Sequence, residues 1–142
     1  MSLEQIEAAI PHRKPMLLLD EIVERGEDRI VCRKTFRDDE YFFQGHYPGM
    51  PLVPGVILCE AAMQAGAVLL SAQLSDAGEG APVATRMNNV KFRQMVKPGD
   101  TIDIEIKLDE RMADAFFMTA KVSTGGKVAV RFEFACTVAK VA

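Results

Sequence analysis

The sequence predicts an α+β fold, in which an antiparallel sheet packs against one long and unusually apolar helix. Residues 55–73 carry few polar side chains and follow Pro54, a residue suited to the first turn of a helix. Residues 101–110 alternate strictly between apolar and polar side chains, as expected of a strand with one dry face. The predicted helix would be roughly 25 to 30 Å long, so it is the only element long enough to cover that face.

Length and composition bound the class of protein. With 142 residues, of which 49% are hydrophobic, the chain can build its own core, and we expect a single domain over residues 1–142. A net charge of −3 and an isoelectric point near 5.4 argue against nucleic-acid binding, which needs a basic surface. Glu60 and Gln64 interrupt the longest apolar run, and the acidic N-terminus does not resemble a signal peptide. We therefore expect neither a membrane span nor export.

The cysteines and histidines indicate the compartment. Cys32, Cys59 and Cys136 are odd in number and widely spaced in mostly apolar surroundings, which is typical of free thiols in a reducing compartment. With two histidines and no C-x-x-C or H-x-x-x-H pairing, the sequence predicts no metal site. We expect a cytoplasmic protein.

Three elements are predicted before the long helix. Ser2 and Gln5 have the spacing of a capping box for a short helix over residues 3–9. Residues 16–24 and 29–36 are predicted strands, joined by a Gly-Glu-Asp turn.

Four more strands are predicted after the long helix. Residues 75–82 contain two glycines and are expected to form a mobile loop. The strands follow over residues 83–96, 101–110, 116–123 and 127–139. Pro98-Gly99-Asp100 and Gly125-Gly126 supply two of the turns between them. With the two earlier strands, this makes a six-stranded antiparallel sheet.

The segment that leads into the long helix is stiff. Residues 45–54 contain three prolines and two glycines around His46, and each proline pushes its preceding residue towards extended geometry. The aromatic residues 41–43 are expected to pack beneath this segment, and ligand contact is the less favoured interpretation. A single histidine near a helix start is more often a surface or capping residue than a catalytic one.

Two polar side chains on the apolar helix are harder to explain as ordinary surface residues. Glu60 and Gln64 are four residues apart, so they lie on one side of the helix. A buried carboxyl group is unfavourable unless it is hydrogen-bonded or keeps its proton. For Glu60, a structural hydrogen bond and a chemical role are equally open, whereas Gln64 alone would be a core amide. His12 is a second functional candidate, but its early position and basic neighbours favour a structural role.

The segment GHYPGMPLVPGVILCEAAMQ closely resembles the signature of the FabZ-type 3-hydroxyacyl-acyl carrier protein dehydratases. That signature reads roughly G-H-F-P-G-x-P-x-M-P-G-V-L-x-x-E-A-x-A-Q. The resemblance continues in IPHRKPMLLLDEIVE before it and VKFRQMVKPGDTIDIEI after it, so it covers nearly the whole chain. The departures within the signature are Tyr47, Val53, Ile57 and Met63.

The resemblance implies a hot-dog fold, in which a six-stranded antiparallel sheet wraps around the long apolar helix. It implies dehydration of a (3R)-3-hydroxyacyl-acyl carrier protein to the trans-2-enoyl product, within type II fatty acid biosynthesis and without a cofactor. In the family each site lies at a dimer interface, with the histidine from one protomer and the glutamate from the other, and dimers assemble into hexamers. A dimer also agrees with a helix that one sheet cannot hide completely. The implied partner is an acyl carrier protein with a phosphopantetheine arm.

The residues of the signature suit this reaction. A neutral imidazole is available near pH 7, so His46 suits the base that takes the C2 proton. Burial disfavours a charged carboxylate, so Glu60 suits the acid that protonates the leaving hydroxyl. Unpaired backbone N–H groups at Gly55 and Val56, at the helix N-terminus, suit the thioester oxygen, and the family assigns this contact to the position of Gly55. Gln64 would orient the carboxyl group or the leaving water.

Two other functions compete with dehydration. A hot-dog thioesterase would share the fold and the acyl-thioester substrate, but it lacks the combination of His46 and Glu60. A non-catalytic acyl-carrier-binding subunit would keep the fold, but nothing structural requires His46, Gly55, Glu60 and Gln64 together. The related dehydratase that also isomerises the double bond has Asp at the position of Glu60, so Glu60 favours plain dehydration.

Two further features concern the substrate. Lys91, Arg93 and Lys97 are candidates for docking the acidic carrier protein, and ordinary solvated strand charges are an equally good interpretation. Four methionines could line an acyl tunnel or fill the core: Met16, Met50, Met87 and Met95.

Overall fold

A computed structural model describes residues 3–74 and 80–140. Two α-helices, a short 3₁₀ helix and six strands follow one another along this part of the chain. They are α1 (Leu3–Ala9), β1 (Glu21–Arg25), β2 (Arg29–Thr35), the 3₁₀ helix (Tyr41–Gln44), α2 (Gly55–Leu74), β3 (Gly80–Phe92), β4 (Thr101–Met112), β5 (Ala115–Thr124) and β6 (Lys127–Lys140).

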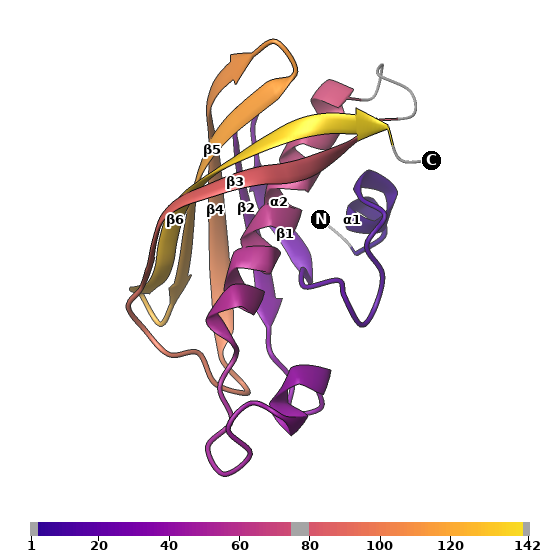
Figure 1. Cartoon of the computed structure of the whole chain (residues 1–142). Helices are drawn as coiled ribbons and strands as arrows, with labels where there is room; N and C mark the ends of the chain where they lie inside the picture. Colours follow the sequence, from indigo (N-terminus) through magenta and orange to yellow (C-terminus); the bar gives the residue numbers. More distant parts are fainter. Residues whose placement is uncertain (1–2, 75–79, 141–142) are drawn as a thin grey trace.

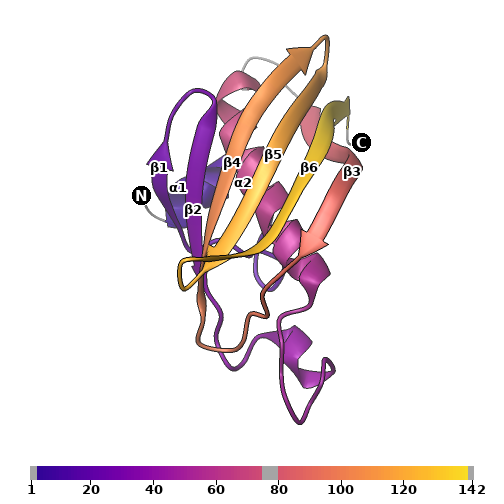
Figure 2. The same cartoon turned by 90° about the vertical axis from the view of Figure 1, so that its left-hand side faces the viewer.

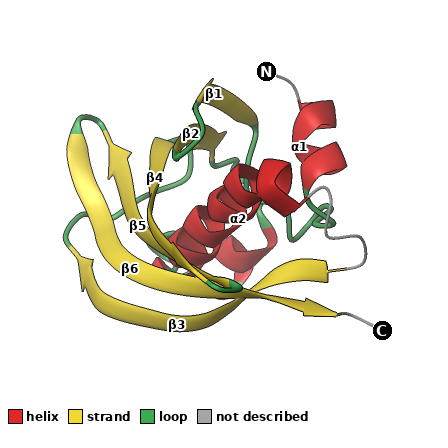
Figure 3. Cartoon of the chain, turned by 90° about the horizontal axis from the view of Figure 1, so that it is seen from above, coloured by secondary structure: helices red, strands yellow, loops and turns green. Residues whose placement is uncertain are grey.

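One antiparallel sheet contains all six strands, in the order β1-β2-β4-β5-β6-β3 (Figures 1 and 2). The sheet curls around α2, which lies along its concave face, and α1 lies on the far side of α2 (Figure 3). Helix and sheet bury one continuous apolar core. The predicted α+β architecture, with six strands wrapped around one central helix, is therefore confirmed.

The period of two in β4 and β6 fixes which face of the sheet meets the helix. Ile102, Ile104 and Ile106 of β4 are fully buried, while the residues between them are exposed or half-buried. Because successive side chains of a strand point to opposite faces, the charged residues of β4 face away from α2. Gly125 and Gly126 have positive φ angles of 56° and 78°, as a two-residue hairpin turn requires.

Two predicted strands have wrong boundaries. Residues 16–20 belong to no strand, and β1 begins only at Glu21. The reason lies in the backbone at Met16 and Leu18, whose carbonyl and N–H groups bind the side chain of Gln64 on α2 instead of a neighbouring strand. The strand predicted to reach Val96 ends at Phe92, because the chain then turns back to the segment before α2, where the Val96 carbonyl accepts a hydrogen bond from the Val53 N–H.

The predicted loop over residues 75–82 ends earlier than expected, since β3 already includes residues 80–82. Residues 75–79 lie outside the described part of the chain.

Helix α2 is central but not buried on every side. Its side facing the sheet is closed, with Ala61, Ala65 and Val68 fully buried. On its open side Met63 and Ala67 are only partly buried, and Val56 in the first turn is 71% exposed. The sheet therefore leaves one side of the helix open in the single chain, as its apolar composition on nearly all sides led us to expect. By length and hydropathy α2 would also pass for a membrane span, yet 61% of its most apolar 18-residue stretch is buried inside the fold.

The sheet approaches α2 closely at Gly66. A Cβ atom at this position would lie 2.8 Å from the Phe134 ring and 3.3 Å from the Met118 sulfur. Glycine here is what allows the helix to sit against β5 and β6 at this depth.

Candidate active site

His46 is held in one orientation by the stiff segment that surrounds it. Its Nδ1 lies 3.0 Å from the carbonyl oxygen of Leu52. A carbonyl oxygen only accepts hydrogen bonds, so in the neutral imidazole Nδ1 carries the hydrogen and Nε2 carries the lone pair. Tyr47, with a positive φ of 57°, packs edge-on against the imidazole at 4.7 Å between ring centroids. The histidine is thus oriented with one basic nitrogen available.

Beneath this segment, the aromatic residues of the 3₁₀ helix divide into two kinds. Phe42 and Phe43 are buried and in contact, whereas Tyr41 is 45% exposed. The expected packing role therefore applies to the two phenylalanines.

Glu60 and Gln64 form one hydrogen-bonded unit on α2. The Gln64 amide nitrogen donates to Glu60 Oε2 at 2.9 Å and also to the Met16 carbonyl at 2.9 Å. The Gln64 oxygen accepts the N–H of Leu18 at 2.8 Å, and Gln64 is almost fully buried. Gln64 therefore has the contacts of a satisfied core amide and, at the same time, those of a residue that orients Glu60.

Glu60 is less buried than its place in an apolar helix suggested. Its side chain is 27% exposed, and it opens into a small cavity of about 110 Å³. The other residues that line this cavity are His12, Met63, Gln64, Ala67, Pro82, Ala84 and Cys136. The burial expected of this carboxyl group is therefore only partial in the single chain, because the open side of α2 leaves this surface uncovered.

The structure does not bring His46 and Glu60 together within one chain. No hydrogen bond or ion pair joins them among the described residues, and His46 is absent from the lining of the Glu60 cavity.

The start of α2 offers free backbone donors. Ile57 and Leu58 donate to the Pro54 carbonyl at 2.9 and 3.3 Å, whereas in the described part of the chain no hydrogen bond uses the N–H groups of Gly55 and Val56. A Cβ at position 55 would lie 2.6 Å from the Phe92 ring, so glycine here first serves the packing of Phe92. The two N–H groups and the positive end of the helix dipole remain suited to an oxygen that gains negative charge.

The sequence-predicted carrier residues are only partly grouped. Lys91 and Arg93 line one groove of about 400 Å³ together with Arg131, while Lys97 lies outside it in the loop before β4. Lys91 pairs with Arg131 across β3 and β6, and neighbours across an antiparallel pair share a face. Arg131 alternates with the buried Val130 and Phe132, so this basic groove lies on the sheet face away from α2.

The sequence makes His12 a second functional candidate and favours a structural role for it, and its ring lies at the candidate site. Its Nε2 is 3.8 Å from Glu60 Oε2. No sequence signal identified this contact, nor the backbone groups of Met16 and Leu18 that hold Gln64, because they lie 46 to 48 residues away along the chain.

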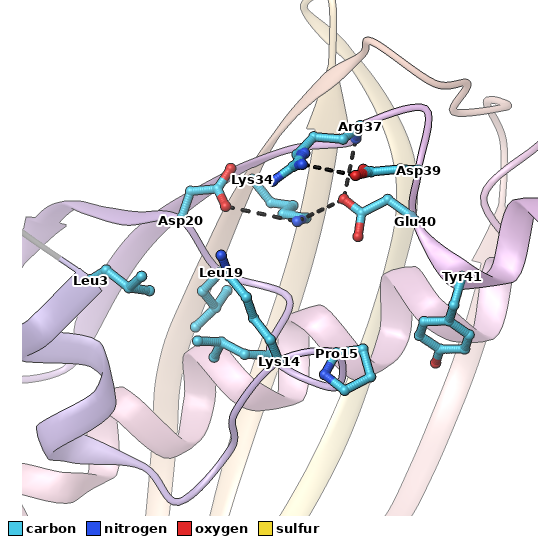
Figure 4. Close-up of a pocket in the computed structure, with 11 residues that line it drawn as sticks. Leu3, Lys14, Pro15, Leu19, Asp20, Lys34, Arg37, Asp39, Glu40 and Tyr41 are labelled. Atoms are coloured by element: carbon cyan, nitrogen blue, oxygen red, sulfur yellow. Dashed lines mark hydrogen bonds and ion pairs between the residues drawn. The ribbon is translucent and has the colours of Figure 1, made fainter.

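A larger cavity of about 380 Å³ lies elsewhere, between the α1–β1 linker and the 3₁₀ helix (Figure 4). Its charged groups are largely neutralised by one another: Lys34 contacts Glu40 at 2.8 Å and Asp20 at 3.7 Å, and Arg37 contacts Asp39 at 2.8 Å. Neither His46 nor Glu60 lines it, so it is not the candidate active site. Among the described residues, no group of three or more His, Cys, Asp or Glu is placed to hold a metal ion.

The fold defines the class of protein. The dehydratase heterocomplex ApeI:P from Xenorhabdus doucetiae has a solved structure that matches with a TM-score of 0.80, over 95% of this chain and 91% of that one. At 18% sequence identity this likeness shows the fold alone. A six-stranded antiparallel sheet curled around a central helix is the hot-dog fold, as the resemblance implied.

Sequence comparison then identifies the family. A family model described as a FabA-like domain matches residues 10–133. The 3-hydroxyacyl-[acyl-carrier-protein] dehydratase FabZ of Koribacter versatilis (strain Ellin345) is 37% identical, over 97% of this chain and 89% of the relative. The FabZ of Caulobacter vibrioides (strain NA1000 / CB15N) is 40% identical, over 97% and 88%. The chain belongs to the FabZ-type 3-hydroxyacyl-[acyl-carrier-protein] dehydratases, so the expected family and enzyme class, a hydro-lyase, are confirmed.

Proposed function

We propose that this chain dehydrates (3R)-3-hydroxyacyl-acyl carrier protein to the trans-2-enoyl product in fatty acid biosynthesis, with His46 as base and Glu60 as acid. The observation that carries the proposal is the pair of oriented side chains in the family signature. His46 presents a free Nε2, and Glu60 is held by Gln64 at the edge of a cavity. The chain acts as one domain over residues 1–142 in the cytoplasm, and needs no cofactor because only protons and water are exchanged.

The reaction can be written on these atoms. His46 Nε2 takes the C2 proton, and that electron pair becomes the C2–C3 double bond as the C3–O bond breaks. Glu60 gives its proton to the departing hydroxyl, which leaves as water. During proton abstraction the thioester oxygen gains negative charge, and the N–H groups of Gly55 and Val56 stabilise it.

The site is completed by a second copy of the chain. Within one chain His46 and Glu60 do not meet, as described above, and β3 is an outer strand of the sheet whose described hydrogen-bonded partner is β6 alone. Exposed apolar side chains follow this edge and the open side of α2: Val56, Val83, Met87 and Phe92. Such an edge needs a partner strand or cover. A homodimer formed through this surface would build each site from His46 of one protomer and Glu60 of the other. Three such dimers then make up the full assembly.

The acyl chain length that the enzyme accepts depends on the exposed residues of the proposed dimer surface. Met16, Met50, Met87 and Met95 are all exposed in the single chain, so they do not fill its core. The remaining interpretation is that some of them line the acyl tunnel of the dimer.

The direct test follows the absorbance of the conjugated enoyl thioester when pure protein meets a 3-hydroxyacyl thioester. Wild type should give the signal, and His46→Ala and Glu60→Gln should each lose about 10²-fold or more in kcat, because each removes a proton-transfer group. Near-normal turnover by both variants would rule out the scheme. Release of free thiol in place of the enoyl signal would identify a thioesterase, and silence with intact carrier-bound substrate would identify a binding subunit.

The carrier protein docks on the basic residues of β3, β6 and the segment that follows β3. Lys91, Arg93 and Arg131 outnumber the one acidic residue of their groove, Glu133, which suits an acidic partner, and Lys97 extends the positive charge towards the loop before β4. Charge reversal of Arg93 and Lys97 to Glu should raise KM for carrier-bound substrate and leave KM for a small thioester unchanged. Equal changes for both substrates would reject docking at these residues.

A further inference from the structure

A second histidine lies beside the proposed acid. His12 comes from the linker between α1 and β1, and its Nε2 lies 3.8 Å from Glu60 Oε2. Both side chains are about one quarter exposed, at 28% and 27%, and both line the same small cavity. The proposed reaction, as written above, does not use this residue.

The surroundings of the ring determine where its hydrogen lies. His12 Nδ1 is buried and has no hydrogen-bond partner among the described residues. A buried N–H group without an acceptor is more unfavourable than a buried lone pair without a donor. The favoured tautomer therefore carries its hydrogen on Nε2, the nitrogen that faces Glu60.

Gln64 and His12 then both direct an N–H group at the same oxygen of Glu60. The Gln64 amide donates to Oε2 at 2.9 Å, and His12 Nε2–H faces Oε2 as well. An oxygen that accepts two N–H groups is poorly placed to carry a proton itself. We propose that His12 is a positioning residue for dehydration, which with Gln64 makes Oε2 the accepting oxygen and leaves Oε1 to give its proton to the substrate.

His12 and Glu60 are not yet hydrogen-bonded in the free chain. At 3.8 Å the pair is longer than a hydrogen bond, and catalytic hydrogen bonds often tighten only when substrate is bound. Other groups near the pair do not compete for it. The Arg13 guanidinium donates to the carbonyl groups of Glu7, Ile10 and His12, and the remaining titratable residue of the cavity is Cys136, whose pKa is raised by burial to about 11.

Two replacements of His12 separate its hydrogen bond from its volume. His12→Phe keeps a ring but has no donor, and His12→Gln places an amide N–H near the position of Nε2. We expect kcat to fall about tenfold in His12→Phe with KM changed less than twofold, and to recover most of that loss in His12→Gln. The matched control is Lys14→Ala in the same linker, which should behave as wild type. Equal loss in the Phe and Gln variants, or a loss expressed only in KM, would overturn the proposal.

A double-mutant cycle with Glu60→Gln tests whether His12 acts through Glu60. If it does, His12→Phe should have no further effect on the residual activity of Glu60→Gln, whereas an independent structural effect would multiply the two losses. The inference rests on the proposed role of Glu60, and the cycle keeps the two apart. An active Glu60→Gln variant would remove the proposed role of Glu60 as acid, while an impaired Glu60→Gln beside an unimpaired His12→Phe would remove only the role of His12.

Discussion

Gln64 connects the stability of the chain to the geometry of its proposed acid. It is 1% exposed and makes three hydrogen bonds, to the backbone of Met16 and Leu18 and to Glu60. Two of these bonds fix the linker that precedes β1, and the third fixes the carboxyl group. Any change at Gln64 should therefore alter folding and activity together.

Gln64→Leu leaves the Leu18 N–H and the Met16 carbonyl without partners. The free energy of unfolding should fall by about 2 to 4 kcal/mol, measured by urea denaturation, because a buried polar group without a partner is unfavourable. The control is Gln73→Leu, the same change on the same helix at a half-buried residue whose side chain makes no hydrogen bond among the described residues. It should alter stability by less than about 0.5 kcal/mol. Equal effects would show that the hydrogen bonds of Gln64 do not matter.

At the scale of residues, the sequence could predict a contact within one helix but not a contact between distant segments. The family signature contains His46, Gly55, Glu60 and Gln64, and the spacing of Glu60 and Gln64 predicted their contact across one helical turn. The approach of His12 to Glu60 depends on how the linker folds over α2, and no local pattern encodes it. Basic neighbours in sequence favoured a structural role for His12, whereas its flanking Arg13 binds backbone carbonyl groups and leaves Glu60 to His12.

Among the elements, α2 sets the depth of the core. Gly66 lets β5 and β6 approach the helix, since a Cβ there would lie 2.8 Å from Phe134 and 3.3 Å from Met118. Gly66→Ala should lower the free energy of unfolding by about 1 to 3 kcal/mol through overpacking, although alanine is the better helix former by about 1 kcal/mol. Thermal denaturation would measure this change.

Gly26→Ala is the matched control for Gly66→Ala. A Cβ at Gly26 would meet its nearest neighbour, the Arg29 carbonyl oxygen, at an ordinary 3.8 Å, and its φ is not positive. We expect a change within about 0.5 kcal/mol. A Gly66→Ala variant as stable as wild type would show that the sheet can shift away from the helix without loss.

The type of an element could be predicted where the hydrophobic periodicity is strong. The boundary of an element could not be predicted where side chains from distant segments bind its backbone. The alternation of residues 101–110 predicted β4, and the apolar run after Pro54 predicted α2. Residues 16–20 are as apolar as a strand, but their backbone groups serve Gln64 and β2 rather than a continuous ladder. Such competition between a side chain and a neighbouring strand leaves no periodic trace in the sequence.

For the molecule as a whole, three buried thiols link stability to alkaline pH. Burial raises the pKa of Cys32 from an ordinary value of 9.0 to about 12, and the pKa of Cys59 and Cys136 to about 11. Each raised pKa favours the neutral thiol in the folded state. The stability that a buried neutral thiol contributes is therefore fully present below pH 9 and is lost as the pH rises towards 11 or 12.

Urea denaturation at pH 8 and pH 10 should therefore show a lower free energy of unfolding at the higher pH. The decrease should be smaller in Cys32→Ala, which removes the thiol with the largest shift. Other groups titrate in the same range, so the difference between wild type and variant is the quantity that matters. The same decrease in both proteins would contradict the assignment to Cys32.

The central claim at this scale is that one active site needs two chains. Its most direct test co-expresses His46→Ala and Glu60→Gln chains with different tags and purifies the assemblies that carry both. A mixed dimer contains one site with both residues intact if they come from different protomers, so its activity should approach about half that of wild type. Each variant alone should be nearly inactive. If the mixed assemblies are as inactive as the single variants, His46 and Glu60 do not act across a dimer interface, and the proposed site is wrong.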